Sequence, residues 1–341
     1  MTRVKAGLIG LTGRGRLIHD SLQADPVIEL IAVADHDRAL AVRLAEETGA
    51  APYDDARRAV VESAARGAQA LFIALPPAET DEYLRVAAGL KLAAFVLPPV
   101  ARRFDVAKEL ADLFAQADVP LVVARPWQCE PAYLRLHDLP SLAGHVFAAV
   151  ADVSCPVDQP LDWQGDARRA GGGVLLHGGY EMTDAIVTLL GVPTEVYAVM
   201  GCSLPPGQTR LYDTEDAASI VCRYADDRTA TVACRRAAAP ENWSMTLCGS
   251  KATVNLSPES MTVTEGSDHR VTTTAVHTSN RLAPPVSVFV ASLAAGVSRM
   301  PSDVTEHLGT MATIMAAYLS TRTGQPESPG KFLELPRVGE R

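Results

Sequence analysis

Short apolar segments alternate with amphipathic segments through the first 125 residues of the chain. An apolar run of about four to eight residues without polar alternation is typical of a strand buried on both faces, as in parallel sheets. Amphipathic segments between such runs predict helices that cover the sheet. A doubly wound α/β domain is therefore expected. Its expected strands are 4–9, 29–34, 70–75, 93–97 and 120–124, and its helices are expected at 17–22, 38–48, 80–88 and 105–117.

The segments after residue 125 alternate apolar and polar residues instead. This alternation predicts a sheet with one covered and one open face, which is usual for antiparallel strands. A chain of 341 residues is long enough for two domains of ~150 residues each. We expect a parallel-sheet domain over 1–125 and an α+β domain with a large, mainly antiparallel open sheet over 126–341. The expected strands of the second part are 146–154, 195–201, 217–224, 229–235, 244–248 and 253–256, and its helices are 175–190, 286–296 and 305–323.

A glycine-rich turn follows the first expected strand. Dinucleotide-binding turns place glycine at the first, third and sixth positions, for the tight turn, for approach of the pyrophosphate and for packing of the helix on the strand. Gly10 and Gly15 occupy the first and sixth positions, whereas Thr12 stands at the third and Gly13 follows it. The turn therefore predicts a Rossmann-type domain with a modified third position.

A carboxylate ends the second expected strand. Asp35 lies 25 residues after Gly10, where an acidic side chain accepts hydrogen bonds from the adenosine ribose hydroxyls. A 2′-phosphate would meet like charge there, and no basic residue follows before Arg38. The sequence therefore predicts NAD rather than NADP as the cofactor, with Arg14 either near the phosphates or simply exposed. The alternative is that the fold persists while the cofactor site is degenerate.

The charge balance argues against nucleic-acid partners. With 31 basic and 40 acidic residues the net charge is −9, so the chain as a whole does not attract phosphate backbones. The basic pairs, Arg235–Arg236 among them, are scattered and expected on solvated surfaces. No signal peptide or apolar run of membrane-spanning length is apparent, and a cytoplasmic protein without a membrane partner is expected. The six cysteines and the seven histidines other than His177 show no metal-site spacing, so no metal ligands are expected among them.

Several further motifs carry a family resemblance. They are 7–10 with 13–16, 32–35, 74–77, 131–136, 248–251 and, most specifically, 171–173 before a helix that ends at 190–191. With these motifs the chain resembles the Gfo/Idh/MocA oxidoreductase family over nearly its whole length. The resemblance implies an NAD(P)-binding Rossmann domain, a sugar, polyol or similar small-molecule substrate, and subunits that pair through the open sheet face as homodimers or homotetramers. It also implies that Pro76 faces the cofactor.

Two positions depart from the pattern of this family. Its members place Glu-Lys-Pro after the fourth strand, and the lysine acts as acid/base and orients the cofactor; here the same place reads Leu97-Pro98-Pro99. Pro98 thus stands at the cofactor without a side-chain proton to exchange. The histidine often found after the proline turn corresponds to Thr80. Hydride transfer at a carbinol needs a group that handles the hydroxyl proton, so the site is expected to be rewritten.

Three polar side chains follow the glycine triplet. His177, Glu181 and Asp184 stand where the family has Asp, His and Asp, and their spacing of four and three places them on one face of a helix. One interpretation is a helix-stabilising His–Glu pair. Another is a relocated acid/base, in which Glu181 orients the imidazole and His177 touches the substrate. A divalent-metal site is a third.

Three functions stay open at this point. The first is an NAD-dependent oxidoreductase in which His177 replaces the missing base. The second is a non-redox pseudoenzyme that serves as a sensor or partner subunit. The third is a non-redox enzyme that uses His177, Glu181 and Asp184. Membership of the family favours the first, whereas the missing lysine favours the other two.

Overall fold

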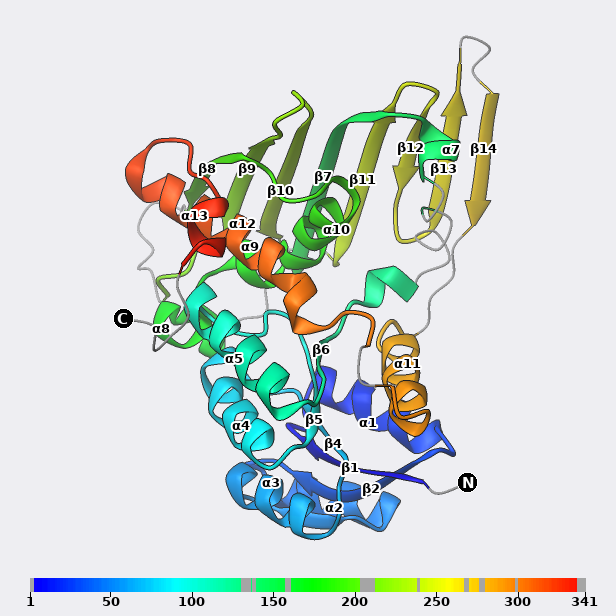
Figure 1. The fold of residues 1–341 in the computed structure, drawn as a ribbon, viewed down its shortest axis with the longest axis vertical. Coiled ribbons are helices and arrows are strands. Elements are labelled where there is room, and N and C mark those ends of the chain that lie inside the picture. Colours follow the sequence, from blue (N-terminus) through cyan, green and yellow to red (C-terminus); the bar gives the residue numbers. More distant parts are fainter. Residues whose placement is uncertain are drawn as a thin grey trace. The chain divides into compact units, whose positions relative to one another are not determined.

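The structure is a computed structural model, shown in Figure 1. The chain forms two compact units. The first comprises Met1–Pro126 and Asn280–His307, and the second comprises Trp127–Ser279 and Leu308–Arg341. The residues that the structure describes are 3–129, 136, 139–156, 161–202, 212–237, 240–266, 270–275, 280–297 and 300–335.

The first unit is built on a six-stranded parallel sheet with the order β3-β2-β1-β4-β5-β6. This is the strand order of a dinucleotide-binding fold, and it confirms the predicted fold class. The strands are β1 (Val4–Ile9), β2 (Ile28–Ala34), β3 (Ala51–Tyr53), β4 (Ala70–Ile73), β5 (Ala93–Val96) and β6 (Leu121–Val123). The helices are α1 (Arg14–Ala24), α2 (Arg38–Thr48), α3 (Ala56–Ala65), α4 (Pro77–Gly89), α5 (Phe104–Ala117) and α11 (Ala283–Ala294). The 3-10 turn η1 (Pro126–Cys129) follows β6 and belongs to the second unit from Trp127 on.

Two elements of this unit were not expected from the sequence. The strand β3 has only three residues, and its middle residue, Pro52, is exposed, so it lacks the signal of a buried strand. The helix α3 begins after Asp55, whose side chain accepts a hydrogen bond of 2.8 Å from the Arg58 amide. Such a cap replaces a missing backbone partner at the helix start.

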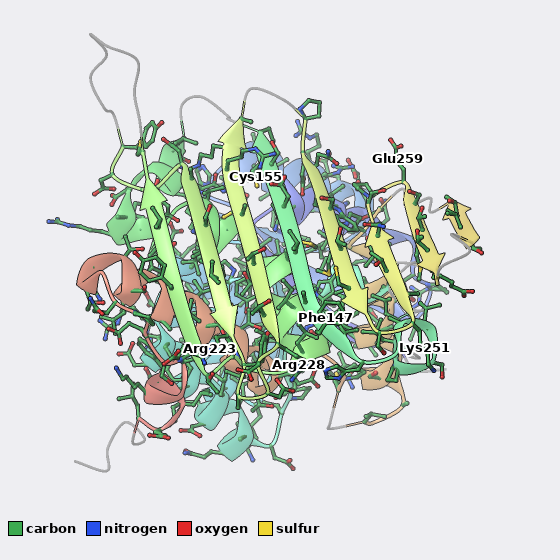
Figure 2. All side chains as sticks on the ribbon, turned by 90° about the horizontal axis from the view of Figure 1, so that it is seen from above. Phe147, Cys155, Arg223, Arg228, Lys251 and Glu259 are labelled. Atoms are coloured by element: carbon green, nitrogen blue, oxygen red, sulfur yellow. The ribbon has the colours of Figure 1, made fainter. Side chains whose placement is uncertain are left out.

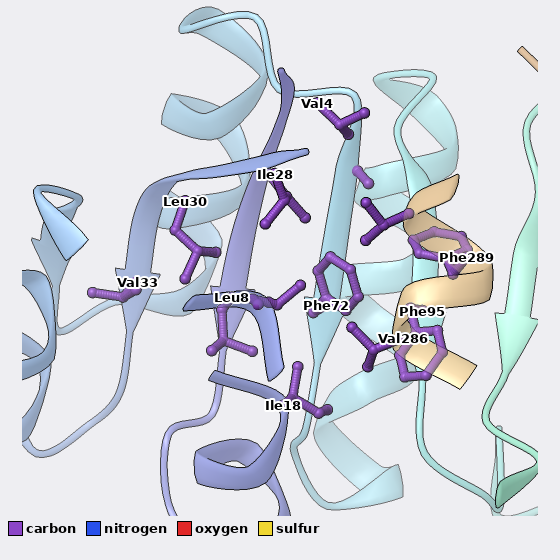
Figure 3. Close-up of a cluster of buried hydrophobic side chains, with 14 of the residues drawn as sticks. Val4, Leu8, Ile18, Ile28, Leu30, Val33, Phe72, Phe95, Val286 and Phe289 are labelled. Carbon is purple, nitrogen blue, oxygen red and sulfur yellow. The ribbon is translucent and has the colours of Figure 1, made fainter. Parts of the chain in front are cut away.

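A helix from late in the sequence completes the core of the first unit. The Phe289 ring of α11 lies 5.4 Å from that of Phe72 and 5.5 Å from that of Phe95, measured between ring centroids. Figure 3 shows these three rings in the buried cluster. The Asn280 side chain donates a 3.1 Å hydrogen bond to the Ser21 hydroxyl of α1. From the sequence we expected the residues of α11 to belong to the second domain, because that domain was expected to comprise 126–341.

The second unit contains an eight-stranded sheet with the order β14-β13-β12-β11-β7-β10-β9-β8. β7 and β10 pair in parallel, and the other neighbouring strands pair antiparallel. The predicted mainly antiparallel sheet is thus confirmed. The strands are β7 (Val146–Pro156), β8 (Glu195–Gly201), β9 (Ala217–Arg223), β10 (Thr229–Ala237), β11 (Asn242–Gly249), β12 (Ala252–Leu256), β13 (Ser260–Glu265) and β14 (Arg270–Ala275). The other elements are α7 (Leu139–Ala143), η3 (Asp162–Gly165), α8 (Ala167–Ala170), α9 (Val174–His177), α10 (Tyr180–Leu190), α12 (Val304–Thr323), which begins in the first unit, and α13 (Gly330–Leu333).

One face of this sheet is covered and the other is open. Along β9, buried and exposed residues alternate strictly, because successive side chains of a strand point to opposite faces. The helices α9 and α10 pack on the covered face. Figure 2 looks onto the open face, with Phe147 labelled on β7. Large apolar side chains exposed on these strands are Phe147, Val150, Tyr197, Val199 and Val221.

The helix expected over 175–190 is interrupted, so the prediction of one continuous helix was wrong. α9 ends at His177, and α10 begins after Gly179. A Cβ atom at Gly178 would lie 2.3 Å from the Cys155 sulfur of β7. The glycine pair therefore lets the backbone pack directly on the sheet, at the cost of helix continuity. No helix in the described part of the chain is both long and apolar enough to cross a membrane.

Candidate functional site

The glycine turn lies where the strand order of the first sheet reverses. After β1 the chain proceeds to β2 on one side, and it returns after β3 to β4 on the other side. Ligands of open α/β sheets bind beyond the carboxyl ends of the strands at such a reversal. The Gly10 amide donates to the Ala34 carbonyl of β2 at 2.9 Å, and the Ala74 amide after β4 donates to the Ile9 carbonyl at 2.8 Å. These bonds hold the turn at the carboxyl edge.

Backbone crowding explains the two glycines that match the motif. A Cβ atom at Gly10, where φ is +83°, would lie 2.5 Å from the Ala74 carbonyl oxygen. A Cβ atom at Gly15 would lie 2.1 Å from the Gly10 carbonyl oxygen. Neither backbone group can move away as a flexible side chain would. Thr12 and Gly13 lie on the exposed part of the turn, where a threonine at the third position causes no such conflict.

The N-terminus of α1 fits an anionic ligand. Gly13 is its N-cap residue, no side chain caps the helix, and no acidic residue lies in the first turn. The unsatisfied N–H groups and the helix dipole favour a phosphate at this position. Arg14 is exposed and forms no ion pair with any residue that the structure describes. Arg16 contacts Asp20 at 2.9 Å instead.

Asp35 connects the end of β2 to the glycine turn. Its carboxylate, only 3% exposed, accepts hydrogen bonds from the Leu11 amide at 2.8 Å and from the Asp37 amide at 3.0 Å. The His36 Nδ1 atom lies 2.9 Å from the same carboxylate, although its ring is almost fully exposed. A carboxylate has about four acceptor sites, so ribose hydroxyls can still bind if they share or displace the His36 contact.

The proline positions border the same edge. Pro76 is half-buried and precedes α4 as its N-cap residue. The Thr80 hydroxyl contacts the Leu75 and Pro76 carbonyl oxygens, each at 3.1 Å, so it serves the start of α4. Pro98 is half-buried after β5 and joined to Pro99 by a cis peptide bond. The segment 97–101 contains no ionisable side chain.

In the second unit, His177 is held from two sides. Its Nε2 atom lies 3.0 Å from the Ala170 carbonyl oxygen, and its ring meets the Trp163 ring at 5.2 Å between centroids and 81° between planes. A carbonyl oxygen only accepts hydrogen bonds, so Nε2 carries the proton. Nδ1 is therefore the proton-accepting atom of the neutral ring.

The other two predicted residues have different surroundings. Asp184 is 1% exposed, and its two carboxylate oxygens accept hydrogen bonds from the Trp127 indole at 2.9 Å and from the Thr310 hydroxyl at 2.8 Å. It therefore connects η1, α10 and α12 inside the second unit. Glu181 is half-buried in the first turn of α10, where a carboxylate is favoured by the helix dipole. Because of the break at the glycine pair, His177 does not share a continuous helix with them.

The glycine triplet is explained by packing. Gly171 ends α8 in the left-handed conformation. A Cβ atom at Gly172 would lie 2.1 Å from the Tyr318 hydroxyl, and one at Gly173 would lie 2.3 Å from the Glu215 carbonyl oxygen. The triplet therefore brings the backbone against α12 and the segment before β9.

Glu215 and Tyr318 were not identified from the sequence. The Glu215 carboxylate accepts hydrogen bonds from the Gly173 amide at 2.7 Å, the Leu175 amide at 3.0 Å and the Tyr318 hydroxyl at 2.8 Å. Burial, followed by the nearby Glu215 charge, raises the pKa of Tyr318 well above its usual value. No local motif marks these residues, because the carboxylate and the amides it caps lie about 40 residues apart.

The metal interpretation finds no support in the described part of the chain. Among those residues there is no group of three His, Cys, Asp or Glu side chains that could hold a metal ion. The surroundings of Asp184 explain why the predicted trio does not form such a group. Its carboxylate is bonded to an indole and a hydroxyl, and it is therefore not directed at a shared ligand.

Comparison with known proteins identifies the family. Residues 4–125 match the oxidoreductase family with an NAD-binding Rossmann fold, and residues 142–255 match the Gfo/Idh/MocA C-terminal domain. A search of curated proteins by sequence gave no match.

Solved structures share the fold across almost the whole chain. An oxidoreductase from Agrobacterium radiobacter in complex with NAD+, L-tartaric acid and magnesium is 18% identical, with a TM-score of 0.82 and coverage of 97% of this chain and 99% of that one. The WlbA dehydrogenase from Bordetella pertussis, in complex with NADH and UDP-GlcNAcA, is 19% identical, with a TM-score of 0.78 and coverage of 98% and 99%. The UDP-N-acetylglucosamine 3-dehydrogenase GnnA from Acidithiobacillus ferrooxidans is 17% identical, with a TM-score of 0.79 and coverage of 95% and 99%. The two domain matches, in the order that the fold requires, show that this chain belongs to the Gfo/Idh/MocA oxidoreductase family, with an NAD-binding Rossmann domain.

Proposed function

We propose that the protein is an NAD-dependent oxidoreductase of a sugar, polyol or related hydroxylated small molecule, in which His177 replaces the family's lysine as proton-transfer group. The observation that carries the proposal is the turn at Gly10 and Gly15 before the uncapped N-terminus of α1. Carbonyl groups crowd both glycines, so the backbone there is shaped for close approach, and the helix end offers N–H groups to a pyrophosphate.

The substrate class is supported by the ligands of similar proteins. The Agrobacterium radiobacter oxidoreductase was crystallised with L-tartaric acid, and the Bordetella pertussis dehydrogenase with UDP-GlcNAcA. Both ligands carry secondary hydroxyl groups. We therefore propose that the substrate of this chain also carries a secondary hydroxyl group. Neither of the two compounds is itself proposed as the substrate.

The chain itself must supply the proton chemistry. When bound, NAD would supply the nicotinamide that accepts a hydride, which is one proton with two electrons, from the carbinol carbon. Nδ1 of His177 would take the remaining hydroxyl proton, which leaves the substrate as a carbonyl compound. The Ala170 carbonyl keeps Nε2 protonated, which leaves Nδ1 as the atom that takes the proton. In the reverse direction the same atom returns it.

The proposed site residues divide by role. Gly10, Gly15 and the amides of Thr12, Gly13 and Arg14 would hold the pyrophosphate, with Asp35 at the adenosine ribose. Pro76 and Pro98 would border the nicotinamide by shape alone. Glu181 would support His177, and Asp184 would hold the protein framework.

A non-redox binding function is the second candidate. It is favoured by the absence of an ionisable side chain over 97–101 and by the engagement of the Thr80 hydroxyl with backbone carbonyls. Under this alternative the protein binds cofactor or sugar without turnover.

One experiment separates the two candidates. The purified protein is mixed with NAD and a panel of hydroxylated compounds, both unmodified polyols and sugars and their acids or nucleotide conjugates, and reduced-nicotinamide absorbance is followed. We expect the reduced-nicotinamide absorbance to rise with at least one compound of this panel. General acid/base catalysis is worth ~10²–10⁴ in rate, so His177→Ala should lower turnover by that factor in a protein that remains folded. Cofactor binding without turnover of any compound would support the second candidate.

We also propose that the protein is a homo-oligomer in the cytoplasm. The open sheet face carries exposed Val150, Val199 and Val221 beside the Asp152–Arg235 ion pair, and a large exposed apolar patch is typical of an interface. A second copy related by a twofold axis can present the same patch to it. All six cysteines are free thiols, as is usual in a reducing compartment.

A further inference from the structure

Two adjacent arginines at the end of β10 have opposite surroundings. Arg235 lies on the open face, where its guanidinium pairs with Asp152. The Arg236 side chain lies on the other face and is only 6% exposed. Expecting both on a solvated surface was therefore wrong for Arg236. Alternation along the strand separates the two side chains, and a buried guanidinium requires partners.

The partners of Arg236 come from segments far apart in the sequence. Its Nη1 atom donates to Asp216 Oδ1 at 3.0 Å and to the Thr214 hydroxyl at 3.1 Å. Its Nη2 atom donates to the Gln164 carbonyl oxygen at 3.3 Å. The other Asp216 oxygen accepts from the Tyr212 hydroxyl at 3.0 Å. The guanidinium thus joins β10, the segment before β9 and η3.

The 3-10 turn η3 is fastened to the sheet at its end. The Gln164 carbonyl accepts from the Thr214 hydroxyl at 2.8 Å, in addition to Arg236. The Gly165 carbonyl accepts from the Asp213 amide at 3.0 Å. Two consecutive carbonyls therefore receive donors from the segment before β9 or from β10. This fixes the position of the turn that carries Trp163.

The turn and the short segment after it, 162–170, hold His177. The Trp163 ring meets the imidazole edge to face, and the Ala170 carbonyl, a few residues further along, accepts from Nε2. Asp166 caps α8 between them through the Arg168 amide. These two contacts of the imidazole come from one short segment, 162–170.

We infer that Arg236 is a positioning residue that fixes the orientation and tautomer of His177 through the Gln164 carbonyl and Trp163. The inference depends on the proposed function only for its effect on turnover. Loss of the guanidinium leaves the Gln164 carbonyl with the Thr214 hydroxyl and leaves Asp216 without its cation. The turn then moves relative to α8, Trp163 no longer packs in one position, and the Nε2–Ala170 bond is made less often.

The test measures the imidazole directly. The full-length protein is labelled with ¹⁵N-histidine, and the His177 signal is assigned by its loss in His177→Gln. Long-range ¹H–¹⁵N spectra then report which ring nitrogen carries the proton. We expect the Nε2–H form in the unaltered protein. We expect an approximately five-fold shift of the tautomer ratio toward Nδ1–H in Arg236→Met, the factor that one typical net hydrogen bond supplies.

Three further variants make the test specific. Arg235→Met removes the neighbouring arginine from the opposite face and should leave the His177 signal unchanged. Arg236→Lys keeps a cation near Asp216 and should therefore shift the His177 tautomer ratio less than Arg236→Met does. Trp163→Leu leaves the Arg236–Asp216 pair intact, and should shift the tautomer ratio in the same direction as Arg236→Met. If Arg236→Met fails to fold, Arg236→Lys provides the test of Arg236, and an unchanged tautomer ratio in that variant would count against the inference.

The outcomes separate the inference from the function on which it rests. An unchanged tautomer ratio in folded Arg236→Met, or in Trp163→Leu, would overturn the inference. An equal shift in Arg235→Met would also overturn it, since the effect would then be a general one of the sheet. A shifted tautomer together with unchanged turnover and KM would support the inference and contradict the proposed role of His177. A fall in kcat of ~10-fold with KM nearly constant would support both.

Discussion

The Asp35 carboxylate accepts a 2.8 Å hydrogen bond from the Leu11 amide, and this contact joins the end of β2 to the first residue after Gly10. The same carboxylate also accepts a hydrogen bond from the Asp37 amide. One side chain therefore shapes the glycine turn. Under the proposed function the same carboxylate would also meet the adenosine ribose, which would couple local structure to cofactor affinity at this residue.

Replacing Asp35 should lower both thermal stability and cofactor binding. Asp35→Ala leaves the Leu11 and Asp37 amides without their carboxylate, and an unsatisfied buried donor costs ~1–3 kcal/mol. Asp37→Ala is the matched control, because it removes the N-cap carboxylate of α2 at a cost of ~1 kcal/mol. Differential scanning fluorimetry with and without NAD checks this. Both variants should melt earlier, but only Asp35→Ala should lose the rise in melting temperature that NAD produces.

NAD should bind more tightly than NADP. A 2′-phosphate beside Asp35 would add negative charge near a buried carboxylate, and the nearby Arg38 is 80% exposed and lies 3.7 Å from Asp54. An exposed cation that already has an acidic neighbour compensates little. We expect at least ~10-fold weaker binding of NADP, which corresponds to ~1.4 kcal/mol. Titration calorimetry with both cofactors measures the ratio, and equal or tighter NADP binding would refute the assignment.

A methyl group at Gly15 should disrupt the turn, whereas one at Gly89 should be tolerated. The Gly15 Cβ would lie 2.1 Å from a backbone oxygen, but nothing lies within 4 Å of a Cβ at Gly89 in α4. Overpacking against backbone costs ~1–3 kcal/mol or more, while alanine in place of a helical glycine gains up to ~1 kcal/mol. Melting temperatures should fall for Gly15→Ala and hold or rise for Gly89→Ala. A Gly15→Ala protein with unchanged melting temperature and NAD affinity would contradict the crowding argument.

Charge on the open sheet face should dissociate the proposed oligomer. Val150 on β7 and Val221 on β9 are both about half exposed, and Val150→Arg with Val221→Arg would place buried, unpaired cations in an interface. Sedimentation velocity should show a smaller species for the double variant. Val288→Arg on α11, where the valine is 44% exposed, is the control and should leave the sedimentation coefficient unchanged. A monomeric unaltered protein would show the oligomer proposal to be wrong.

Alkaline stability should depend on Tyr212. Burial, followed by the hydrogen bond to Asp216, raises the pKa of Tyr212 from 10.0 to about 12. The folded state therefore retains a proton that the unfolded chain releases above pH 10.0, so the contribution of Tyr212 is complete below that pH and is lost as pH rises toward about 12. Tyr212→Phe should weaken the decline in melting temperature over this window. An identical decline in both proteins would contradict the raised pKa.

Local sequence determined most of the first unit. Apolar runs specified β1, β2, β4, β5 and β6, because strands buried on both faces need continuous apolar sequence. Gly10, Gly15 and Asp35 could be predicted as parts of the glycine turn and the strand end from their spacing, because a tight turn and a strand-end carboxylate have fixed spacings. The short strand β3 escaped prediction because its burial is too slight to leave a pattern.

The sequence by itself determined the two sheets, the glycine turn and the alternation that separates the covered face from the open one. These features arise from contacts with a fixed local period. Only the tertiary structure decided that the helix before Gly191 breaks at Gly178, where Cys155 approaches, that Asp184 is an interior acceptor, and that α11 packs in the first unit. It alone distinguished buried Arg236 from exposed Arg235. Each of these depends on residues far apart in the chain, and no local period records which distant group will meet a side chain.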